Sequence, residues 1–228
     1  PNPDNAVTGV QTCALPILNK DFAGRWPNGF RNNRPWSGPM ERGGKTLSKQ
    51  PLNRPLPDII EDGLSVLFVG YNPGLRSGAV GHHFAGPSNR FWKLLAESGL
   101  TPRRYRPEED RSLPSLGFGI TNIVPRVTRA AAEITKEEFR RGRKRLLALI
   151  KKHRPGIVCY EGIGVYREFA LRKEAPWGLQ ETRVVPGVLD FVVPSPSGLC
   201  RVPYAEQLHW LLVLKGLKED VENKGRSE

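Results

Sequence analysis

Residues 66–92 read VLFVGYNPGLRSGAVGHHFAGPSNRFW, and this stretch decides the fold. It opens with apolar, partly β-branched residues that stop at Gly70, which predicts a buried strand over Leu64–Val69. The Asn-Pro-Gly at 72–74 then predicts a tight turn at the carboxyl end of that strand. Open α/β sheets bind their ligands at the carboxyl ends of strands, so we expect a site here.

The remainder of the chain alternates between strand and helix patterns. Thr135 begins a capping-box spacing, which predicts a helix from there to about His153. Further strands are predicted at Phe118–Val124, Gly156–Tyr160, Arg183–Val185 and Val188–Val193, and further helices at Ser88–Gly99, at Val165–Leu171 and from Pro203 onward, where Leu208, Leu211, Leu212 and Leu217 form an apolar stripe. This alternation predicts an α/β fold, a three-layer α/β/α sandwich with a mostly parallel central sheet.

Composition is typical of a soluble globular protein with a single core: 228 residues, of which 38% are hydrophobic and 25% charged. No apolar run approaches the roughly 20 residues of a membrane span, and no secretion signal is recognisable, so we expect no membrane partner. Cys13, Cys159 and Cys200 form no CxxC pair. They therefore indicate neither a disulfide framework nor a metal site, and they fit a cytoplasmic protein.

The chain divides into four parts. Residues 7–17 look like the translation of a sequencing adapter, so we interpret residues 1–17 as an artefact. Residues 18–54 are basic, rich in Asn, Gly and Pro, and predicted to be irregular or disordered. Residues 55–218 have globular patterning, and residues 219–228 are predicted to be a polar tail.

The net charge of +12 and the pI near 10.0 favour nucleic acid as a partner. The runs Arg103–Arg106 and Arg140–Arg145 are expected to be solvated faces, with phosphate contact as the alternative.

The quoted stretch holds no general base, because no Asp or Glu lies between Gly63 and Ala96. It also lacks GxGxxG and GxxxxGK[ST], the patterns of dinucleotide and P-loop sites. The Asn72 amide cannot take a proton at neutral pH, but its oxygen can orient a water molecule. Such a group suits a reaction whose leaving group departs largely on its own, for example cleavage of a base–sugar bond. An ordinary turn remains the alternative for these three residues.

Residues 70–92 resemble the GINPG…GHH[FY]…GPxNxFW signature of the mismatch-specific uracil/thymine DNA glycosylases, family 2 of the uracil-DNA glycosylase superfamily. PSPSGLCR at 194–201 is similar to that family's NPSGLSR-type loop, and GFGITNIVPRVT at 117–128 to its GFTNMVERTT segment. The resemblance runs in order from about Leu56 to Lys218. It implies hydrolysis of the N-glycosidic bond of uracil opposite guanine in duplex DNA, initiating base-excision repair. Thymine and other modified pyrimidines are further candidate substrates.

By this resemblance Asn72 is the catalytic residue that positions the attacking water. Phe84 stacks on the flipped base, with Asn122 and His83 beside it. The full base pocket comprises Tyr71, Ser77, His83, Phe84, Asn122 and Thr128. No metal or organic cofactor is implied, and no lysine is placed for strand cleavage, so we expect a monofunctional, monomeric enzyme in a bacterial cytoplasm, acting at the nucleoid.

The carboxyl-terminal block has its own physical logic. An enzyme that acts on a base must extrude it from the duplex and fill the gap. Leu199, at the tip of a stiff Pro/Ser loop, then matches the family's apolar wedge. Gly198 and Arg201 match contacts to the orphaned guanine. Ser197 and Arg76 are candidate phosphate contacts, and the expected partner is duplex DNA with a G·U or G·T mismatch.

Three residues depart from the family pattern. Tyr71 replaces an isoleucine, which would narrow the pocket or add a hydrogen bond, and Ser195 replaces an asparagine at the start of the wedge loop. Glu161 stands where relatives have a small polar residue, and we expect it at the surface, with reach into the site as the alternative.

Two other functions are compatible with the sequence. One is a module that binds mismatched or damaged DNA without turnover. The other is a nucleoside or nucleotide N-glycosidase, which would need neither the Leu199 wedge nor a basic face.

Overall fold

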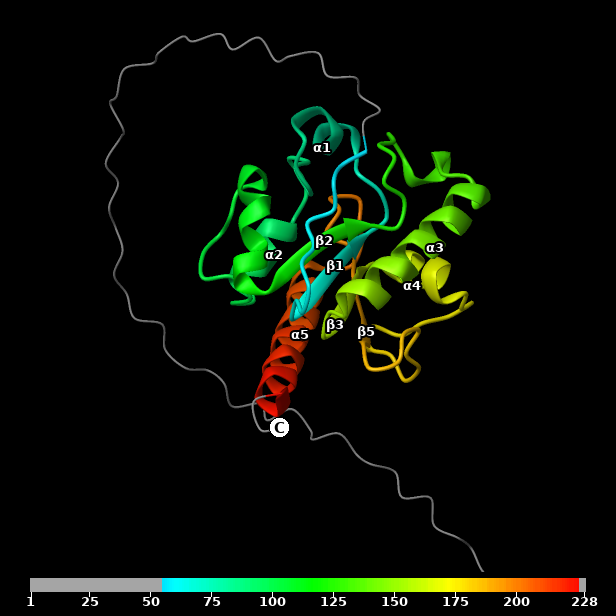
Figure 1. The fold of residues 1–228 in the computed structure, drawn as a ribbon. Helices are drawn as coiled ribbons and strands as arrows, with labels where there is room; N and C mark the ends of the chain where they lie inside the picture. The colour runs from blue at the N-terminus through cyan, green and yellow to red at the C-terminus, as the bar shows by residue number, and fades with distance from the viewer. Residues whose placement is uncertain (1–54, 226–228) are drawn as a thin grey trace, which may run out of the picture. The chain divides into compact units, whose positions relative to one another are not determined.

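The computed structural model describes residues 55–225, and the sequence predictions for residues 1–17 and 18–54 lie outside this range. Its strands are β1 (Val66–Gly70), β2 (Phe118–Asn122), β3 (Ile157–Glu161), β4 (Gly178–Leu179) and β5 (Leu189–Val193) (Figure 1). Its helices are α1 (Leu75–Val80), α2 (Phe91–Glu97), α3 (Lys136–His153), α4 (Ile163–Ala170) and α5 (Tyr204–Gly225), with 3-10 segments at Pro107–Leu116 and Ala131–Glu133.

The strands form a sheet in the order β2-β1-β3-β5-β4, in which β4 alone among them is antiparallel to its neighbour. The chain leaves β1 for β2 on one side and returns for β3 on the other. The strand order therefore reverses between β1 and β3, which is where α/β sheets form a ligand crevice at their carboxyl edge. The predicted mostly parallel α/β architecture is confirmed.

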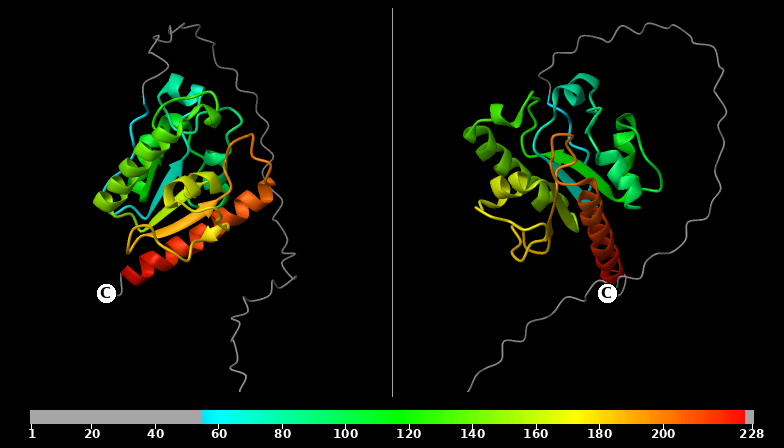
Figure 2. Two further views of the ribbon diagram at one scale, coloured as in Figure 1. Left: turned by 90° about the vertical axis from the view of Figure 1, so that its right-hand side faces the viewer. Right: turned by 180° about the vertical axis from the view of Figure 1, so that it is seen from behind.

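Helices cover both faces of this sheet (Figure 2). Alternate residues of each strand point to opposite faces, so both faces of the parallel strands are apolar. Phe68 and Phe191 pack with α2 and α5 on one face, whereas Leu67 and Val158 pack with α3 and α4 on the other. The two cores hold the carboxyl ends of the strands in register, which fixes the platform for any site there.

Two details of the carboxyl-terminal half differ from the sequence predictions. Arg183–Val185 is not a strand: it forms a turn, in which the Val184 N–H donates to the buried carboxylate of Asp190 at 2.8 Å. The edge strand lies earlier, at Gly178–Leu179. The Asp190 side chain interrupts the expected hairpin because it takes up the backbone donor of Val184, which a strand ladder would use.

Helix α5 also differs in its register and its end. Leu212 is exposed, and Leu214 is buried in its place beside Leu211, because positions three apart share one helix face. The helix continues to Gly225, so residues 219–225 of the predicted polar tail are helical, and Glu222 accepts a hydrogen bond from Ser65 at 2.5 Å.

Gly142 fixes how closely α3 approaches the sheet. A Cβ atom at this position would overlap the backbone carbonyl of Ile123. We expect Gly142→Ala to lower the free energy of unfolding by about 2 kcal/mol, because the helix must move off a well-packed face. Gly216→Ala in α5 is the matched control: nothing lies within 4 Å of its added Cβ, so it should stabilise the protein by about 1 kcal/mol. Urea unfolding measures both, and equal stabilities would contradict this packing.

Candidate active site

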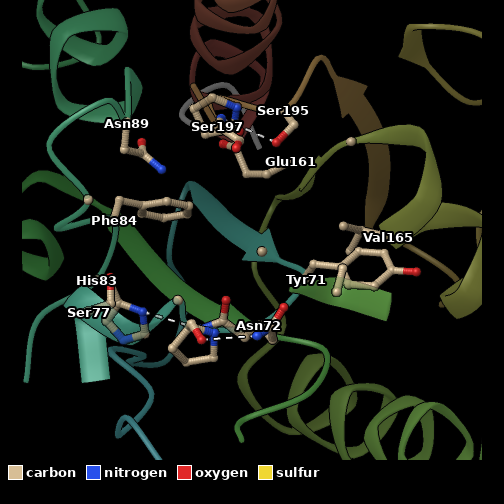
Figure 3. Close-up of a pocket in the computed structure, with 18 of the residues that line it drawn as sticks. Tyr71, Asn72, Ser77, His83, Phe84, Asn89, Glu161, Val165, Ser195 and Ser197 are labelled. Atoms are coloured by element: carbon tan, nitrogen blue, oxygen red, sulfur yellow. Dashed lines mark hydrogen bonds between the residues drawn. The ribbon is translucent and has the colours of Figure 1, made fainter. Parts of the chain in front are cut away.

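A pocket of about 500 Å³ opens at the carboxyl edge of the sheet, where the strand order reverses (Figure 3). Four parallel strands each deliver a polar side chain at or just beyond their last residue: Asn122 from β2, Asn72 from β1, Glu161 from β3 and Ser195 from β5. Their order along the edge follows the order of the strands. These four residues are up to 123 positions apart in the chain.

Asn72 is held by its amide nitrogen. Its Nδ2 donates to Thr128 Oγ1 at 2.7 Å and to the Pro73 carbonyl at 3.0 Å. The Thr128 hydroxyl in turn donates to the Ala130 carbonyl at 2.9 Å, which orients it as an acceptor toward Asn72. Both amide hydrogens are therefore engaged, and the Oδ1 atom remains free to accept a hydrogen bond within the pocket that Asn72 lines.

Thr128 is 2% exposed and lies behind Asn72, outside the described lining of the pocket. In the structure it supports Asn72 from behind, and its predicted place in the base pocket stays a prediction. A backbone hydrogen bond holds Thr128 in this position. Its N–H donates to the Pro73 carbonyl and so ties the segment around Thr128 to the Asn-Pro-Gly turn.

Phe84 forms an aromatic wall of the pocket. Its ring stacks on Phe91 at a centroid distance of 3.9 Å and an interplanar angle of 19°. Its backbone has φ of 51°, a left-handed conformation that is costly for a bulky residue and that clusters at functional sites. Ser77 supports this turn, because its Oγ accepts the Ala85 N–H at 3.0 Å, and it lines the pocket as predicted.

His83 and Asn122 form a polar pair beside Phe84. His83 Nε2 lies 3.0 Å from the Pro57 carbonyl, which can only accept, so we assign the proton to Nε2. Burial lowers the pKa of His83, which favours the neutral ring. Its Nδ1 then accepts from Asn122 Nδ2 at 3.4 Å, and the amide oxygen of Asn122 is turned away from the histidine.

The freed oxygen of Asn122 faces an opening left by Gly70. A Cβ atom on Gly70 would lie 2.5 Å from Asn122 Oδ1 and 3.6 Å from Phe84 Cζ. The absence of a side chain at the end of β1 thus creates the corner in which the amide oxygen and the aromatic ring meet.

Asp110 is a supporting residue that sequence reasoning missed. Its carboxylate is 1% exposed, accepts the His83 backbone N–H at 2.9 Å and lies 3.1 Å from His82 Nδ1. This contact fixes His82 to the 3-10 segment that contains Asp110. Asp110 belongs to the 3-10 segment Pro107–Leu116, whose pattern gave no signal of a contact with the two histidines.

Glu161 is not a surface residue. It is 5% exposed, lines the pocket and ends β3, where it pairs with Val193, the last residue of β5 before the wedge loop. Asn89, also missed, lines the same side of the pocket while its Oδ1 accepts the Phe91 N–H at 2.9 Å. Figure 3 shows both near Ser195 and Ser197.

Tyr71 contributes to the rim of the pocket, and its ring points away from Phe84 (Figure 3). It packs edge-on against Phe139, with centroids 5.1 Å apart, and lies against Val165 and Gly164. Burial raises the pKa of the Tyr71 hydroxyl above its ordinary value. The sequence predicted that Tyr71 either narrows the pocket or adds a hydrogen bond. The structure shows no hydrogen bond from Tyr71 to the described lining residues.

The wedge loop, residues 194–201, is rigid and carries an exposed tip. The Arg90 N–H donates to the Pro196 carbonyl at 2.8 Å, which fixes the loop to the start of α2. Gly198 lies against Ser88, whose Cβ would be 2.5 Å from an added Cβ. Leu199 is 92% exposed at the mouth of the pocket, which it and Ser197 line.

The basic side chains differ in whether they are exposed or already paired with other residues. Arg201 and Arg76 are exposed, and Arg76 lies in a groove next to the pocket, on the other side of Phe84. Arg140 and Arg141 pair with Glu137, and Arg145 bonds Asp58 and the backbone carbonyl of Asn122. Arg145 is therefore a support for the pocket rather than part of a solvated face.

Among residues 55–225, no group of three or more His, Cys, Asp or Glu side chains is arranged to hold a metal ion. No helix in this range is long and apolar enough to cross a membrane.

The family model of the uracil DNA glycosylase superfamily matches this chain over residues 57–216. The chain belongs to this superfamily. The matched region includes nearly all of the described residues and all four strand ends that form the pocket. It indicates an enzyme of the DNA glycosylase class, with DNA as its substrate.

Proposed function

We propose that the chain is a monofunctional, mismatch-specific glycosylase of the uracil/thymine type. It hydrolyses the N-glycosidic bond of uracil opposite guanine in duplex DNA and leaves an abasic site. The observation that carries this proposal is the fixed amide of Asn72, whose two N–H groups are engaged while its oxygen remains free. Such a group orients water without removing its proton.

The neighbouring residues support recognition of a pyrimidine imide. A base extruded from the duplex stacks on the exposed side of the Phe84 ring, whose other side is supported by Phe91. The amide oxygen of Asn122, turned away from His83, accepts the N3–H of uracil or thymine. Cytosine has an acceptor at this position and is disfavoured, because two acceptors would then face each other.

The reaction needs only modest help from the protein once the base is bound. As the bond between the base and C1′ lengthens, positive charge develops on the sugar, and a water held by Asn72 Oδ1 attacks the same carbon. The described lining of the pocket contains no lysine, so no amine is at hand to form a Schiff base with the abasic sugar. We expect base release without strand cleavage.

Duplex DNA as the substrate is supported by the wedge loop. Leu199 presents an apolar side chain to solvent, which is costly unless a partner covers it. Inserted into the helix, it replaces the extruded base, and the adjacent Gly198 backbone and Arg201 approach the unpaired guanine. Ser197, which lines the pocket, and Arg76, which lines the neighbouring groove, would contact phosphates of the bound strand.

Base release from a panel of labelled DNA tests this proposal. The protein is incubated with G·U, G·T and A·U duplexes and with single-stranded uracil DNA, and abasic sites are then cleaved with alkali. We expect the most product from G·U, and strand breaks only after alkali. Tight binding of mismatched duplex without base release would identify a binding module instead, and release from free deoxyuridine alone would identify a nucleoside hydrolase.

A further inference from the structure

Glu161 lines the pocket, and the proposed reaction has so far given it no role. Its Oε1 is buried and has no hydrogen-bond partner within the described residues. No ion pair joins this carboxyl to a cation among the described residues, whereas the buried carboxylates of Asp110 and Asp190 each have partners. A buried carboxyl without a partner is destabilising, so its retention points to a ligand that completes it.

Burial raises the pKa of the Glu161 carboxyl well above its usual range. This shift favours the protonated form, a carboxylic acid, which has one O–H donor in addition to its acceptor oxygen. An acid kept neutral in an apolar site is a known way to place a strong donor beside a developing anion.

The sheet places this donor on one flank of the bound base. Asn122 and Glu161 end the two strands on either side of β1, and Gly70 at the end of β1 forms the floor between them. In Figure 3 Glu161 lies beside Ser195 and Ser197, on the opposite side of Phe84 from Asn72 and His83. A pyrimidine whose N3–H points to Asn122 presents a carbonyl oxygen on each side of that group.

We propose that Glu161, as a neutral acid, donates a hydrogen bond to a carbonyl oxygen of the extruded pyrimidine and stabilises the negative charge that the base gains as it departs. This inference rests on the proposed glycosylase function. It makes Glu161 a catalytic residue for the leaving base, distinct from Asn72, which acts on the water.

The electron balance of this step is simple. The N1–C1′ bond breaks and its electron pair goes to the base, whose anion is delocalised over N1, O2 and O4. Water adds a hydroxyl group to C1′, and the proton it loses neutralises the base. Glu161 keeps its own proton throughout, because it contributes a hydrogen bond rather than a proton transfer.

The pH dependence follows from the groups around Glu161. On its own strand the titratable groups are the buried thiol of Cys159, which interacts electrostatically with Glu161, and the hydroxyl of Tyr160, which donates to Asp190. The other titratable or charged groups of the described lining are Tyr71, His83 and Arg129. The residues that the wedge loop contributes to the lining, at 195–197 and 199, carry no titratable group. The donor form of Glu161 exists below its pKa, so excision should decline as rising pH ionises the acid.

Two substitutions distinguish whether position 161 acts as a neutral hydrogen-bond donor or as a carboxylate. Glu161→Gln keeps a neutral donor of the same length, so we expect a single-turnover rate on G·U duplex within about tenfold of the wild-type rate, without the alkaline decline. Glu161→Leu removes the donor, and we expect a loss of about 100-fold, as for other hydrogen-bond donors to a developing anion. Thermal unfolding should show that neither variant is less stable, because the carboxyl that each replaces makes no hydrogen bond or ion pair to a described residue.

A comparison of two leaving bases gives a measurement that a purely structural role of Glu161 would not affect. 5-Fluorouracil departs as a more stable anion than uracil and needs less help, so Glu161→Leu should lose at least about fivefold less activity on it. An inactive Glu161→Gln, or a wild-type rate that rises with pH through this ionisation, would show that the carboxylate is required and overturn the assignment. Equal rates for all three proteins would overturn it as well. A wild-type protein that releases no base overturns the proposed function and this assignment together.

Discussion

Asn72→Ala is expected to reduce the single-turnover release of uracil from G·U duplex by about 1,000-fold while changing DNA affinity by less than about threefold. The substitution removes the oxygen that orients the attacking water. It leaves the stacking surface of Phe84 and the exposed Leu199 intact, and those two contacts determine how the DNA is held in the proposed complex. Rates are measured with enzyme in excess over labelled duplex, and affinity by fluorescence anisotropy.

Thr128→Val provides the graded control for this prediction. It keeps the shape of a buried side chain but removes the hydroxyl that accepts from Asn72 Nδ2 at 2.7 Å. The amide then keeps its bond to the Pro73 carbonyl and can turn, so we expect a loss of about tenfold. If Asn72→Ala retained more than a tenth of the wild-type rate, Asn72 would not be the residue that positions the water.

The strand ends of the site could be predicted from the sequence because each is marked locally. The run before Gly70 and the turn at 72–74 require only nearest neighbours to interpret. The strand predicted at Phe118–Val124 is two residues shorter in the structure, where it ends at Asn122. Parallel pairing places Gly70 and Asn122 opposite each other. Local patterning thus indicated both strands, whereas the role of Asn122 followed from the family resemblance.

The other side of the pocket could not be predicted in this way. Glu161 was expected at the surface because a lone glutamate after a strand usually lies there, and its burial depends on how the wedge loop folds over β3. Asp110 binds two histidines 27 and 28 residues earlier, a contact that no periodicity encodes. Both are carboxyl groups whose surroundings are set by tertiary packing rather than by sequence neighbours.

The error at Arg183–Val185 has a similar origin. Valine pairs around Pro-Gly are typical of a hairpin, and the pattern took no account of Asp190 on the opposite side of the turn. The buried Asp190 carboxylate accepts the Val184 N–H and the Tyr160 hydroxyl, the latter at 2.6 Å. A side chain thus competes successfully with the backbone ladder, and the edge of the sheet forms elsewhere.

Leu199→Ala is the second prediction with a large effect, and it should act only on duplex DNA. The side chain is 92% exposed in the free protein, so its truncation should leave the free energy of unfolding within about 0.5 kcal/mol of the wild-type value. In the complex the same side chain is buried in the gap left by the extruded base. Burial of a leucine stabilises by about 1.5–3 kcal/mol, which corresponds to a loss of roughly 10- to 100-fold in excision from G·U duplex.

Single-stranded uracil DNA gives the decisive comparison, because it has no base stack to fill and no partner strand to hold apart. Excision from it should change by less than about threefold in Leu199→Ala, so the ratio of duplex to single-strand rates measures the wedge directly. Leu212→Ala, which removes another exposed leucine from α5, is the matched control and should leave both rates unchanged. An equal loss on both substrates would mean that Leu199 shapes the pocket rather than the duplex. The rigid loop beneath it, fixed through Pro196 to Arg90, favours the wedge, since a side chain that must separate stacked bases needs a support that does not yield.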